Sequence, residues 1–460
     1  MKSQKSRKTE HLVIIGGDAA GMSAAMQARR MRPELSITAF EEGPTTSYAA
    51  CGMPYYVEGL VETVDDLVTR RAEVFRKKHN IDARVLHRVE RIDINKKTVQ
   101  VRDLEADSTF PQTYDQLMVA TGATPIRPKK LPGIDAEGIH TLSILPDSER
   151  IRREIEQRSL RSAVIVGGGY IGLEMAEALL ARGLEVSLVE LLPQVMSTLD
   201  EDMADLVADG IRKMGVTLYL GEGVESFQTN EGRVTGVKTS QRLLAADLVV
   251  LAIGIRPNVA LAEEAGIPLG ETGAIRVDDR LRTGAPDVWA AGDCVESFHL
   301  VSGRKIFIAL GTVANKQGRI AGTNIGGGEA RFPGVAGTAI TRVGETEIAR
   351  TGLTVREAGK LEIETVAAFH KGRTKARYFP DAGPMAVKVV AEKRTGRFLG
   401  GQIVGAPGAG KRIDVFATAL HAGLTVSEMR YLGLAYAPPV SPVWDPILGA
   451  VGKAADRVGK

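Results

Sequence analysis

The sequence predicts an α/β protein in which two Rossmann-like dinucleotide-binding domains are followed by a C-terminal α+β domain. Two glycine-rich loops, at residues 16–21 and 167–172, each follow a short apolar run and precede a helical pattern. From about Phe332 the glycine loops give way to alternating strand patterns, and 460 residues are too many for one ordinary core. These observations indicate two similar units and a third, different one.

The composition argues against several classes of function. Lys and Arg together number 59 against 56 Asp and Glu, and this balance gives no support for nucleic acid as the main partner. No apolar run approaches the roughly 18 to 20 residues that cross a bilayer, so we expect no membrane association. Two cysteines without a nearby partner fit a reducing compartment and predict a cytoplasmic protein. Residues 1–10 are basic and polar without an apolar signal segment, and we expect a disordered leader there.

The first glycine loop lies between an apolar run at residues 11–15 and a helical pattern. A second strand, at residues 36–40, ends at Glu41, 25 residues after Gly16, where a dinucleotide fold places the acid that binds a ribose. Asp18 replaces the usual middle glycine; because its carboxylate would repel a pyrophosphate, we expect it to point away or into a helix cap. The candidate cofactor contacts are Gly16, Asp18, Ala19, Gly21 and Glu41.

The second glycine loop has the complete pattern. Gly167 allows the tight turn, Gly169 lets the backbone approach a pyrophosphate, and Gly172 lets the helix pack on the strand. The helix start adds amide donors and positive potential. A strand at residues 186–189 ends at Glu190, and no basic residue follows to pair with a 2′-phosphate, which favours NADH over NADPH. The candidate contacts are Gly167, Gly169, Tyr170, Ile171, Gly172 and Glu190.

Each unit is followed by a similar second element, at residues 117–122 and 248–254, so the chain contains an internal duplication. Two dinucleotide-binding folds predict two bound dinucleotides. The simplest pair is FAD as a tightly bound cofactor and a nicotinamide dinucleotide that binds and dissociates in each turnover. A further strand at residues 287–291 is followed by Gly292 and Asp293, and the carboxylate of Asp293 would be able to reach a ribityl hydroxyl of FAD. The added candidates are Thr121, Gly122 and Asp293 for FAD, and Gly254 for NADH, with NADPH possible in its place.

Residues 47–56, SYAACGMPYY, place a single thiol just beyond the first unit. The other cysteine, Cys294, lies 243 residues further on, which excludes a CxxC dithiol. Gly52 and Pro54 shape the backbone beside Cys51. Three tyrosines lie within five residues of Cys51, and their rings would suit packing against a flat cofactor. We therefore expect the redox chemistry at Cys51, with its thiolate favoured by the flavin and a nearby helix start.

These motifs together resemble the flavoprotein pyridine nucleotide–disulfide oxidoreductases. Within them they resemble the single-cysteine branch of coenzyme A disulfide reductase, NADH oxidase and NADH peroxidase, with coenzyme A disulfide reductase closest. The resemblance covers nearly the whole chain and is most specific at the glycine loops and at residues 47–56, 290–293, 311–318 and 434–439. It implies that Cys51 lies at the flavin and cycles between thiolate and an oxidised form. It also implies a homodimer whose subunits share active sites.

The resemblance and the patterns give four expected regions. They are a leader at 1–10, an FAD-binding domain at 11–145 and 263–331, an NAD(P)H-binding domain at 146–262, and a C-terminal dimerisation domain at 332–460. In the last domain we expect strands near 362–369 and 385–391 and a helix near 413–422, before an aromatic turn at 434–439.

The resemblance also implies a coenzyme A site, with Arg30 suited to a phosphate. Tyr436, supported by Tyr378, would arrive from the other subunit and supply a proton to a leaving thiolate. Ala19 stands where oxidase- and peroxidase-like members have a histidine, which argues against peroxide as the oxidant. Two departures from the reductases are Ala50 in place of Asn and Trp444 in place of Lys. The implied substrate contacts are Ser23, Gln27, Arg30, Ser47 and Asn315.

The resulting hypothesis is an FAD-dependent NAD(P)H oxidoreductase that reduces coenzyme A disulfide, or a related small disulfide, through one redox-active cysteine. Coenzyme A would be its substrate or an adduct on Cys51. Alternatives are an NADH-dependent persulfide or polysulfide reductase and an NADH oxidase. A flavin redox sensor or electron-transfer partner is the non-enzyme alternative. No metal site is expected.

Overall fold

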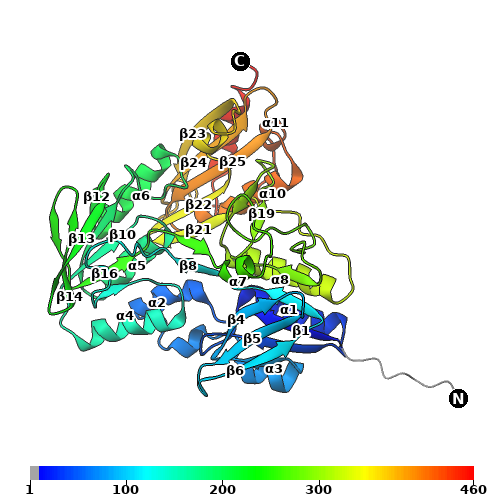
Figure 1. The fold of residues 1–460 in the computed structure, drawn as a ribbon. Coiled ribbons are helices and arrows are strands. Elements are labelled where there is room, and N and C mark those ends of the chain that lie inside the picture. The colour runs from blue at the N-terminus through cyan, green and yellow to red at the C-terminus, as the bar shows by residue number, and fades with distance from the viewer. Residues whose placement is uncertain (1–9) are drawn as a thin grey trace.

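The computed structural model describes residues 10–460, which form three lobes (Figure 1). All of the expected leader except Glu10 lies outside the described residues. No helix within residues 10–460 is long and apolar enough to cross a membrane.

The first lobe contains the first glycine loop and a parallel five-stranded sheet, with strand order β18-β7-β1-β2-β3. Its central strand β1 pairs with β2 and β7, and the apolar side chains of β1 are buried from both sides. Its elements are β1 (His11–Ile15), α1 (Ala19–Met31), β2 (Ser36–Phe40), α2 (Met53–Glu58), α3 (Ala72–His79), β3 (Asp82–Arg84), β4 (His87–Asp93), β5 (Thr98–Asp103), β6 (Ser108–Thr113), β7 (Gln116–Val119), β8 (Ala123–Pro125), β18 (Val288–Ala290), β19 (Glu296–Phe298), β20 (Lys305–Phe307) and α8 (Gly311–Ile325).

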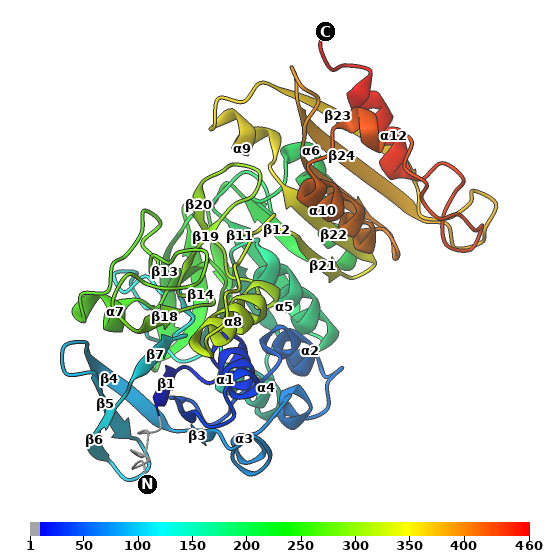
Figure 2. The same ribbon diagram turned by 90° about the vertical axis from the view of Figure 1, so that its right-hand side faces the viewer.

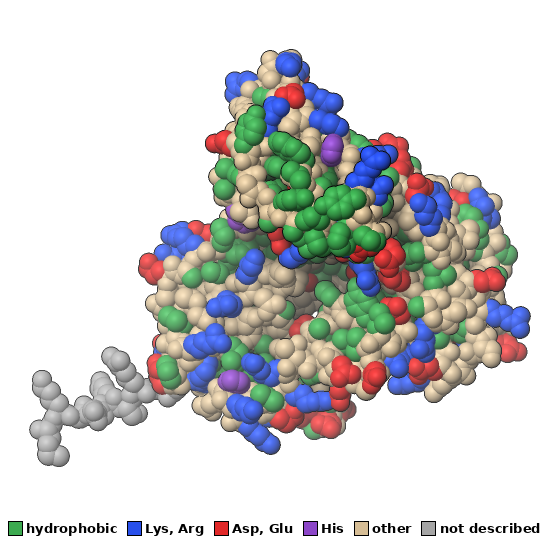
Figure 3. Space-filling view, turned by 180° about the vertical axis from the view of Figure 1, so that it is seen from behind, with side chains coloured by type: hydrophobic (Ala, Val, Ile, Leu, Met, Phe, Trp, Pro, Cys, Tyr) green, Lys and Arg blue, Asp and Glu red, His purple; other side chains and the backbone are tan. Residues whose placement is uncertain are grey.

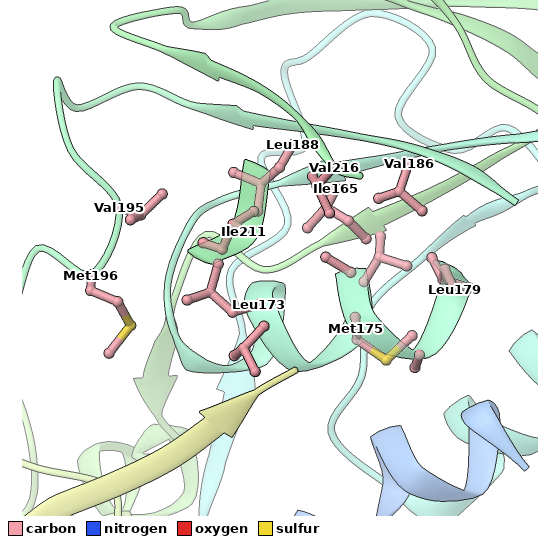
Figure 4. Packing of buried hydrophobic residues seen from close by; sticks show 14 of the residues in the cluster. Ile165, Leu173, Met175, Leu179, Val186, Leu188, Val195, Met196, Ile211 and Val216 are labelled. Carbon is pink, nitrogen blue, oxygen red and sulfur yellow. The ribbon is translucent and has the colours of Figure 1, made fainter. Parts of the chain in front are cut away.

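The second lobe repeats the plan of the first, with strand order β12-β11-β10-β16-β9. Side chains of α5 and α6 interlock with those of the strands, as Figure 4 shows for Leu173, Ile165 and Ile211. Its elements are β9 (Ile139–His140), α4 (Leu145–Gln157), β10 (Ser162–Val166), α5 (Tyr170–Ala181), β11 (Glu185–Glu190), α6 (Glu201–Met214), β12 (Thr217–Leu220), β13 (Val224–Asn230), β14 (Arg233–Thr239), β15 (Leu243–Ala245), β16 (Leu248–Leu251) and β17 (Ile255–Pro257). The chain then returns to the first lobe, where α7 (Ala260–Glu264) packs on β4.

One expected domain boundary needs correction. We placed the start of the second dinucleotide-binding domain at residue 146, but β9 ends before that residue and pairs in parallel with β16 of the second sheet. Strand β9 is only two residues long, and so short a segment has no hydrophobic pattern that indicates which sheet it joins. The second domain therefore begins at or before Ile139.

The third lobe is an antiparallel five-stranded sheet covered by helices, which confirms the predicted α+β domain. The strand order is β21-β22-β25-β24-β23, and α10 and α12 pack on the sheet. The helix predicted at 413–422 is α10, and the two predicted strands are β23 and β24. The elements are β21 (Ala339–Val343), β22 (Thr346–Gly352), α9 (Val355–Gly359), β23 (Thr365–Arg373), β24 (Pro384–Glu392), β25 (Phe398–Gly405), α10 (Ile413–Ala422), α11 (Val426–Met429) and α12 (Pro446–Ala455).

Buried polar contacts join the third lobe to the second. The carboxylate of Asp200 accepts a 2.7 Å hydrogen bond from the amide of Gln402 and lies 3.3 Å from the ammonium group of Lys388. Arg350 donates to the carbonyl oxygen of Thr198 at 2.8 Å. Since these side chains are largely buried, each needs its partner to offset the loss of water. The contacts fix β22, β24 and β25 of the third lobe against the second lobe.

Helices α1 and α8 come from distant parts of the chain and lie side by side (Figure 2). Two glycines of α8 permit this approach, because a Cβ at Gly318 or Gly322 would overlap a backbone carbonyl oxygen of α1. The packing brings the hydroxyl of Ser23 within 2.8 Å of the side-chain oxygen of Asn315. A surface shared by α1 and α8 is thereby fixed.

We predict that Gly318→Ala lowers the free energy of unfolding by about 1 to 3 kcal/mol, because the added methyl group overpacks the α1–α8 contact. Gly311→Ala is the matched control in the same helix, since a Cβ at Gly311 meets no atom within 4 Å. Thermal denaturation of both FAD-loaded variants measures the difference. Equal melting temperatures for the two variants would show that the close approach is not required.

Candidate functional site

The two glycine loops have the same local geometry. The first glycine has a positive φ in each, +106° at Gly16 and +107° at Gly167, a conformation that residues with a side chain rarely adopt. The last glycine, Gly21 or Gly172, lies so close to the carbonyl oxygen of the first that a Cβ would overlap it. The predicted reasons for glycine at these positions therefore apply to both loops.

The two acids at the strand ends also make equivalent contacts. Glu41 accepts a 2.7 Å hydrogen bond from the amide of Gly17, and Glu190 accepts one of 2.7 Å from the amide of Gly168. In each case the second carboxylate oxygen accepts from an amide two residues further along the chain. Both carboxylates are thus held beside their loops, where the sequence predicts a ribose.

Several features at the loops fit bound dinucleotides. A Cβ at Gly169 would meet no atom within 4 Å, so the backbone there is open to a ligand. Tyr170 begins helix α5, and the side chain of Ile171 beside it is exposed. The carboxyl group of Asp293 has no hydrogen-bond partner within residues 10–460, and burial raises its pKa to about 6. A ribityl hydroxyl would supply the missing donor.

The remaining predicted cofactor residues lie where the two dinucleotide units are joined. Strands β8 and β17 pair in antiparallel fashion immediately after Gly122 and Gly254, and both glycines have positive φ. Thr121 donates its hydroxyl to the carbonyl oxygen of Asn258 at 2.6 Å. The carbonyl oxygens of Thr121 and Gly122 also accept hydrogen bonds from Asn258, at 2.8 and 2.9 Å, so this segment is tied to the residue that follows β17. Ala19 begins α1, as expected for a residue facing the first loop's ligand.

Asp18 points away from the loop, as predicted, but it does not cap helix α1 with its side chain. Its carboxylate instead accepts a 3.2 Å hydrogen bond from the amide of Tyr48. Burial raises the pKa of Asp18 to about 6, and the Tyr48 amide opposes that rise. Asp18 therefore connects the first glycine loop to the segment that contains Cys51.

The Cys51 segment is held on both sides by backbone contacts. Ser47, with a positive φ of +50°, donates its amide to the carbonyl oxygen of Gly17 at 3.0 Å. The amide of Ala49 donates to the carbonyl oxygen of Leu67 at 2.8 Å. Cys51 follows in a short 3-10 helix and is exposed, whereas Cys294 is fully buried. Of the two thiols, only Cys51 is accessible to a substrate.

The protein groups around Cys51 act against its thiolate, contrary to our expectation. Although Cys51 is exposed, the surrounding protein removes part of the water around its sulfur and so raises the pKa of the thiol, and the carboxylates of Glu174 and Asp293 raise this pKa further. The nearby helix α2 has only six residues, and the main charges that act on the thiol are all carboxylates. Stabilisation of a thiolate must therefore come from the bound cofactor or substrate.

Glu174 marks the place where all three lobes meet. It lies on α5 of the second lobe, acts on Cys51 of the first, and accepts a 2.6 Å hydrogen bond from Thr341 on β21 of the third. Burial raises the pKa of Glu174, and the Thr341 hydroxyl opposes that rise. The sequence analysis missed both residues, because nothing local to Thr341 indicates that it reaches α5.

The predicted substrate residues on α1 lie along its contact with α8. Ser23 reaches Asn315, and Gln27 donates its amide to the hydroxyl of Thr323 at 3.1 Å. Gln27 also lines a cavity of about 460 Å³ together with the cationic side chains of Lys316 and Arg319. The sequence analysis missed these two cations, although their spacing of three residues places them on one face of α8.

Arg30 is exposed on α1 and has no hydrogen bond or ion pair with any other described residue. Arg29, its neighbour, donates instead to the carbonyl oxygens of Pro33 and Asn80, both at 2.6 Å. Of the two adjacent arginines, only Arg30 is therefore free to bind a ligand.

Tyr378 and Tyr436 lie together on the third lobe, where a hydrogen bond between their hydroxyls raises the pKa of Tyr436. Their side chains are 75% and 47% exposed, and Trp444 nearby in sequence is 71% exposed. Figure 3 shows hydrophobic side chains gathered on the upper lobe, which is the C-terminal one. Within the described chain, no hydrogen bond or charge interaction joins either tyrosine to Cys51.

Comparison with protein families agrees with this geometry. The family described as pyridine nucleotide-disulphide oxidoreductase matches residues 10–318, and its dimerisation domain matches residues 338–446. The chain belongs to this family. The resemblance inferred from the sequence is thereby confirmed, as are the oxidoreductase class and the dimerisation domain at the C-terminus.

The oxidoreductase has relatives of nearly equal length. It is 40% identical over 438 residues to the NAD(P)H coenzyme A polysulfide/persulfide reductase of Pyrococcus horikoshii, covering 95% of this chain and 96% of the relative. A solved structure of reduced CoADR-RHD from Bacillus anthracis is 35% identical, with a TM-score of 0.95 over 98% of this chain and 81% of that one. The NAD-dependent persulfide reductase from A. fulgidus is 40% identical, with a TM-score of 0.93 over 97% of this chain and 83% of that one.

We predict that Glu174→Gln shifts the pH profile of Cys51 alkylation to lower pH, because removing the carboxylate removes a charge that raises the thiol pKa. Iodoacetamide labelling of the FAD-loaded reduced protein between pH 6 and 10 measures the profile. Glu177→Gln is the matched control, since Glu177 lies one helical turn along α5 and is not among the main charges that raise the pKa of Cys51. A profile that stays unchanged or moves to higher pH in Glu174→Gln would contradict the assignment.

Proposed function

We propose that this oxidoreductase uses NADH to reduce coenzyme A disulfide, or sulfur bound to coenzyme A, through Cys51. The observation that supports this most strongly is one exposed thiol beside the first glycine loop, with the second cysteine fully buried. A dithiol mechanism within the chain is therefore unavailable, and the substrate itself must supply the second sulfur. FAD, when bound, supplies the two-electron transfer between NADH and sulfur.

The proposed coenzyme A site extends along α1 from the Cys51 segment. Ser23, Gln27 and Arg30 follow one another on a single face of α1, and the rise of about 1.5 Å per residue separates the first and last by about 10 Å. Gln27 opens into the cavity that contains Lys316 and Arg319. These cations suit the phosphates of coenzyme A, and we propose that its sulfur lies at Cys51.

In the proposed reaction, the thiolate of Cys51 attacks one sulfur of the substrate disulfide. A mixed disulfide with Cys51 forms, and the first coenzyme A leaves as a thiolate. Two electrons, ultimately from NADH, then cleave the mixed disulfide and release the second coenzyme A. Each departing thiolate needs a proton, and we assign its supply to Tyr436 with Tyr378 in support.

A persulfide of coenzyme A would use the same site. The relatives from Pyrococcus horikoshii and A. fulgidus, both 40% identical, are named for persulfide reduction. In that reaction Cys51 would accept the terminal sulfur, and coenzyme A would leave as before. Coenzyme A disulfide and coenzyme A persulfide share the coenzyme A group and differ only in what is bonded to its sulfur. The same cavity on α1 and α8 would therefore bind both.

We predict that the denatured protein as isolated shows a mass increase equal to coenzyme A on Cys51, because a resting single thiol retains its last partner as a disulfide. Intact-mass spectrometry before and after dithiothreitol measures the adduct. In Cys51→Ser the adduct and the disulfide or persulfide reduction should be lost, while FAD and its reduction by NADH are retained. Near wild-type reductase activity in Cys51→Ser would contradict the role of this thiol.

We predict at least tenfold higher kcat/KM for NADH than for NADPH. The carboxylate of Glu190 lies where the ribose would bind, and the following Leu191 and Leu192 offer no charge to a 2′-phosphate. Steady-state kinetics with both cofactors measure the ratio. Leu191→Arg should narrow it, because that side chain is exposed beside Glu190 and would pair with the phosphate. A tenfold advantage for NADPH in the wild type, about 1.4 kcal/mol in the wrong direction, would show that Glu190 is misassigned.

We further predict that mixing Cys51→Ser protein with Tyr436→Phe protein restores activity once subunits exchange. In a mixed dimer, one of the two shared sites would combine an intact Cys51 with an intact Tyr436. Reductase assays before and after mixing measure the gain, and tagged subunits confirm exchange independently. If exchange occurs and the activity remains the average of the two parents, the subunits do not share sites through Tyr436.

A further inference from the structure

A second cavity, of about 480 Å³, lies on the second lobe along the edge strand β9 and helix α4. None of its lining residues belongs to the glycine loops, to residues 47–56 or to the proposed coenzyme A cavity. It is therefore separate from the sites that the proposed function uses. Its charged and polar lining side chains are Arg127, Glu137, His140, Arg150, Arg153, Glu154, Gln157, Arg158 and Arg233.

The charge of this lining is strongly positive. Five arginines face two glutamates, whereas the formal net charge of the entire chain is only +3. Both glutamates are already engaged, since Arg233 pairs with Glu137 at 2.8 Å and also with Glu154. His140 lies 2.7 Å from Glu154 as well. Both glutamates of the cavity are therefore paired with Arg233 or His140, and the other four arginines have no acidic partner within the cavity lining.

Two guanidinium groups remain without a partner. Arg153 and Arg158 form no hydrogen bond through their side chains and no ion pair with any residue in the described range 10–460, and both are exposed to the cavity mouth. By contrast, Arg150 pairs with Asp147, and Arg127 donates to the carbonyl oxygens of Ile134 and Ile139. Guanidinium groups that lie close together in a cavity repel one another, which raises the free energy of the empty cavity. A bound anion would offset this repulsion.

We infer that this cavity binds a compact polyanion that has at least two phosphate groups. Guanidinium groups bind phosphate oxygens in a bidentate manner, and two free arginines provide two such forks. Apart from His140, the lining has no aromatic ring on which a nucleotide base would stack. The volume lies within the range of small-molecule sites. Pyrophosphate and tripolyphosphate have the chemistry that this lining selects.

The position of α4 links this cavity to the Cys51 segment. Arg152, on another face of the same helix, donates to the carbonyl oxygens of Tyr56 and Glu62 at 3.1 and 2.9 Å. Its guanidinium group also lies 4.5 Å from the ring centre of Tyr56. The proposed ligand would therefore bind one face of a helix whose other face holds the end of the segment that contains Cys51.

The test is calorimetric titration of pyrophosphate and tripolyphosphate into the FAD-loaded protein with saturating NAD⁺, which keeps the dinucleotide loops occupied. The double variant Arg153→Gln/Arg158→Gln removes the two free guanidinium groups. Arg394→Gln is the control, since Arg394 is exposed on the third lobe and also lacks an ion pair. A sulfate titration at equal ionic strength controls for screening.

We expect saturable binding in the wild type and in Arg394→Gln, weakened at least tenfold in the double variant, with KM for NADH unchanged in all three. Sulfate should bind at least tenfold more weakly than tripolyphosphate. The inference is overturned if the wild type shows no saturable binding. It is equally overturned if the double variant binds as tightly as Arg394→Gln, because the heat would then come from another site.

Discussion

The hydrogen bond from the amide of Tyr48 to the carboxylate of Asp18 holds the Cys51 segment against the first glycine loop. Asp18 belongs to the first glycine loop, so the bond ties the Cys51 segment directly to the loop that would hold a dinucleotide. The amide of Ser47 adds a second tie, to the carbonyl oxygen of Gly17. A thiol held by two bonds to the loop keeps a fixed distance from whatever the loop binds. Asp18, in place of the usual glycine, thus gives the Cys51 segment a contact that a glycine side chain could not make.

The same arrangement surrounds the thiol with acids. Asp18 and Asp293 titrate near pH 6, and Glu174 is held close by Thr341. The folded pKa values of Asp18 and Asp293 are raised to about 6, so the charged forms of these two groups above that pH oppose both the thiolate and the compact fold, and their protonation at lower pH relieves both effects. Burial raises the pKa of Glu174 in the same direction. At neutral pH the chain alone therefore favours a thiol at Cys51. Hydrogen bonds from bound cofactor hydroxyls to these acids, or an oxidised resting cysteine, would remove the conflict.

Local patterns predicted most of the fold, and the failures came from contacts between distant residues. Helix α10 agrees with the predicted residues because its apolar positions recur with helical spacing, and strand β2 agrees because it is a short, almost continuously buried run. The glycine positions were predictable because one backbone conformation demands them. The partner of Asp18 was not predictable, since Tyr48 lies 30 residues away and donates its backbone amide, which every residue except proline has. Thr341 and Glu174 are 167 residues apart, and neither has a local pattern that points to the other.

The exposure of Tyr378, Tyr436 and Trp444 supports the proposed site shared between two subunits. These are large aromatic side chains on the dimerisation domain. Leaving their apolar surface exposed to water is unfavourable by about 25 cal/mol per Å² relative to burying it. Burial against a second subunit would remove that cost and order the two hydroxyl groups. The Cys51 segment, in turn, lies on the first lobe with its thiol exposed, and the side chains that most influence its pKa are carboxyl groups rather than tyrosine hydroxyls. In the proposed dimer, one association would cover the tyrosines and bring their hydroxyl groups to the thiol.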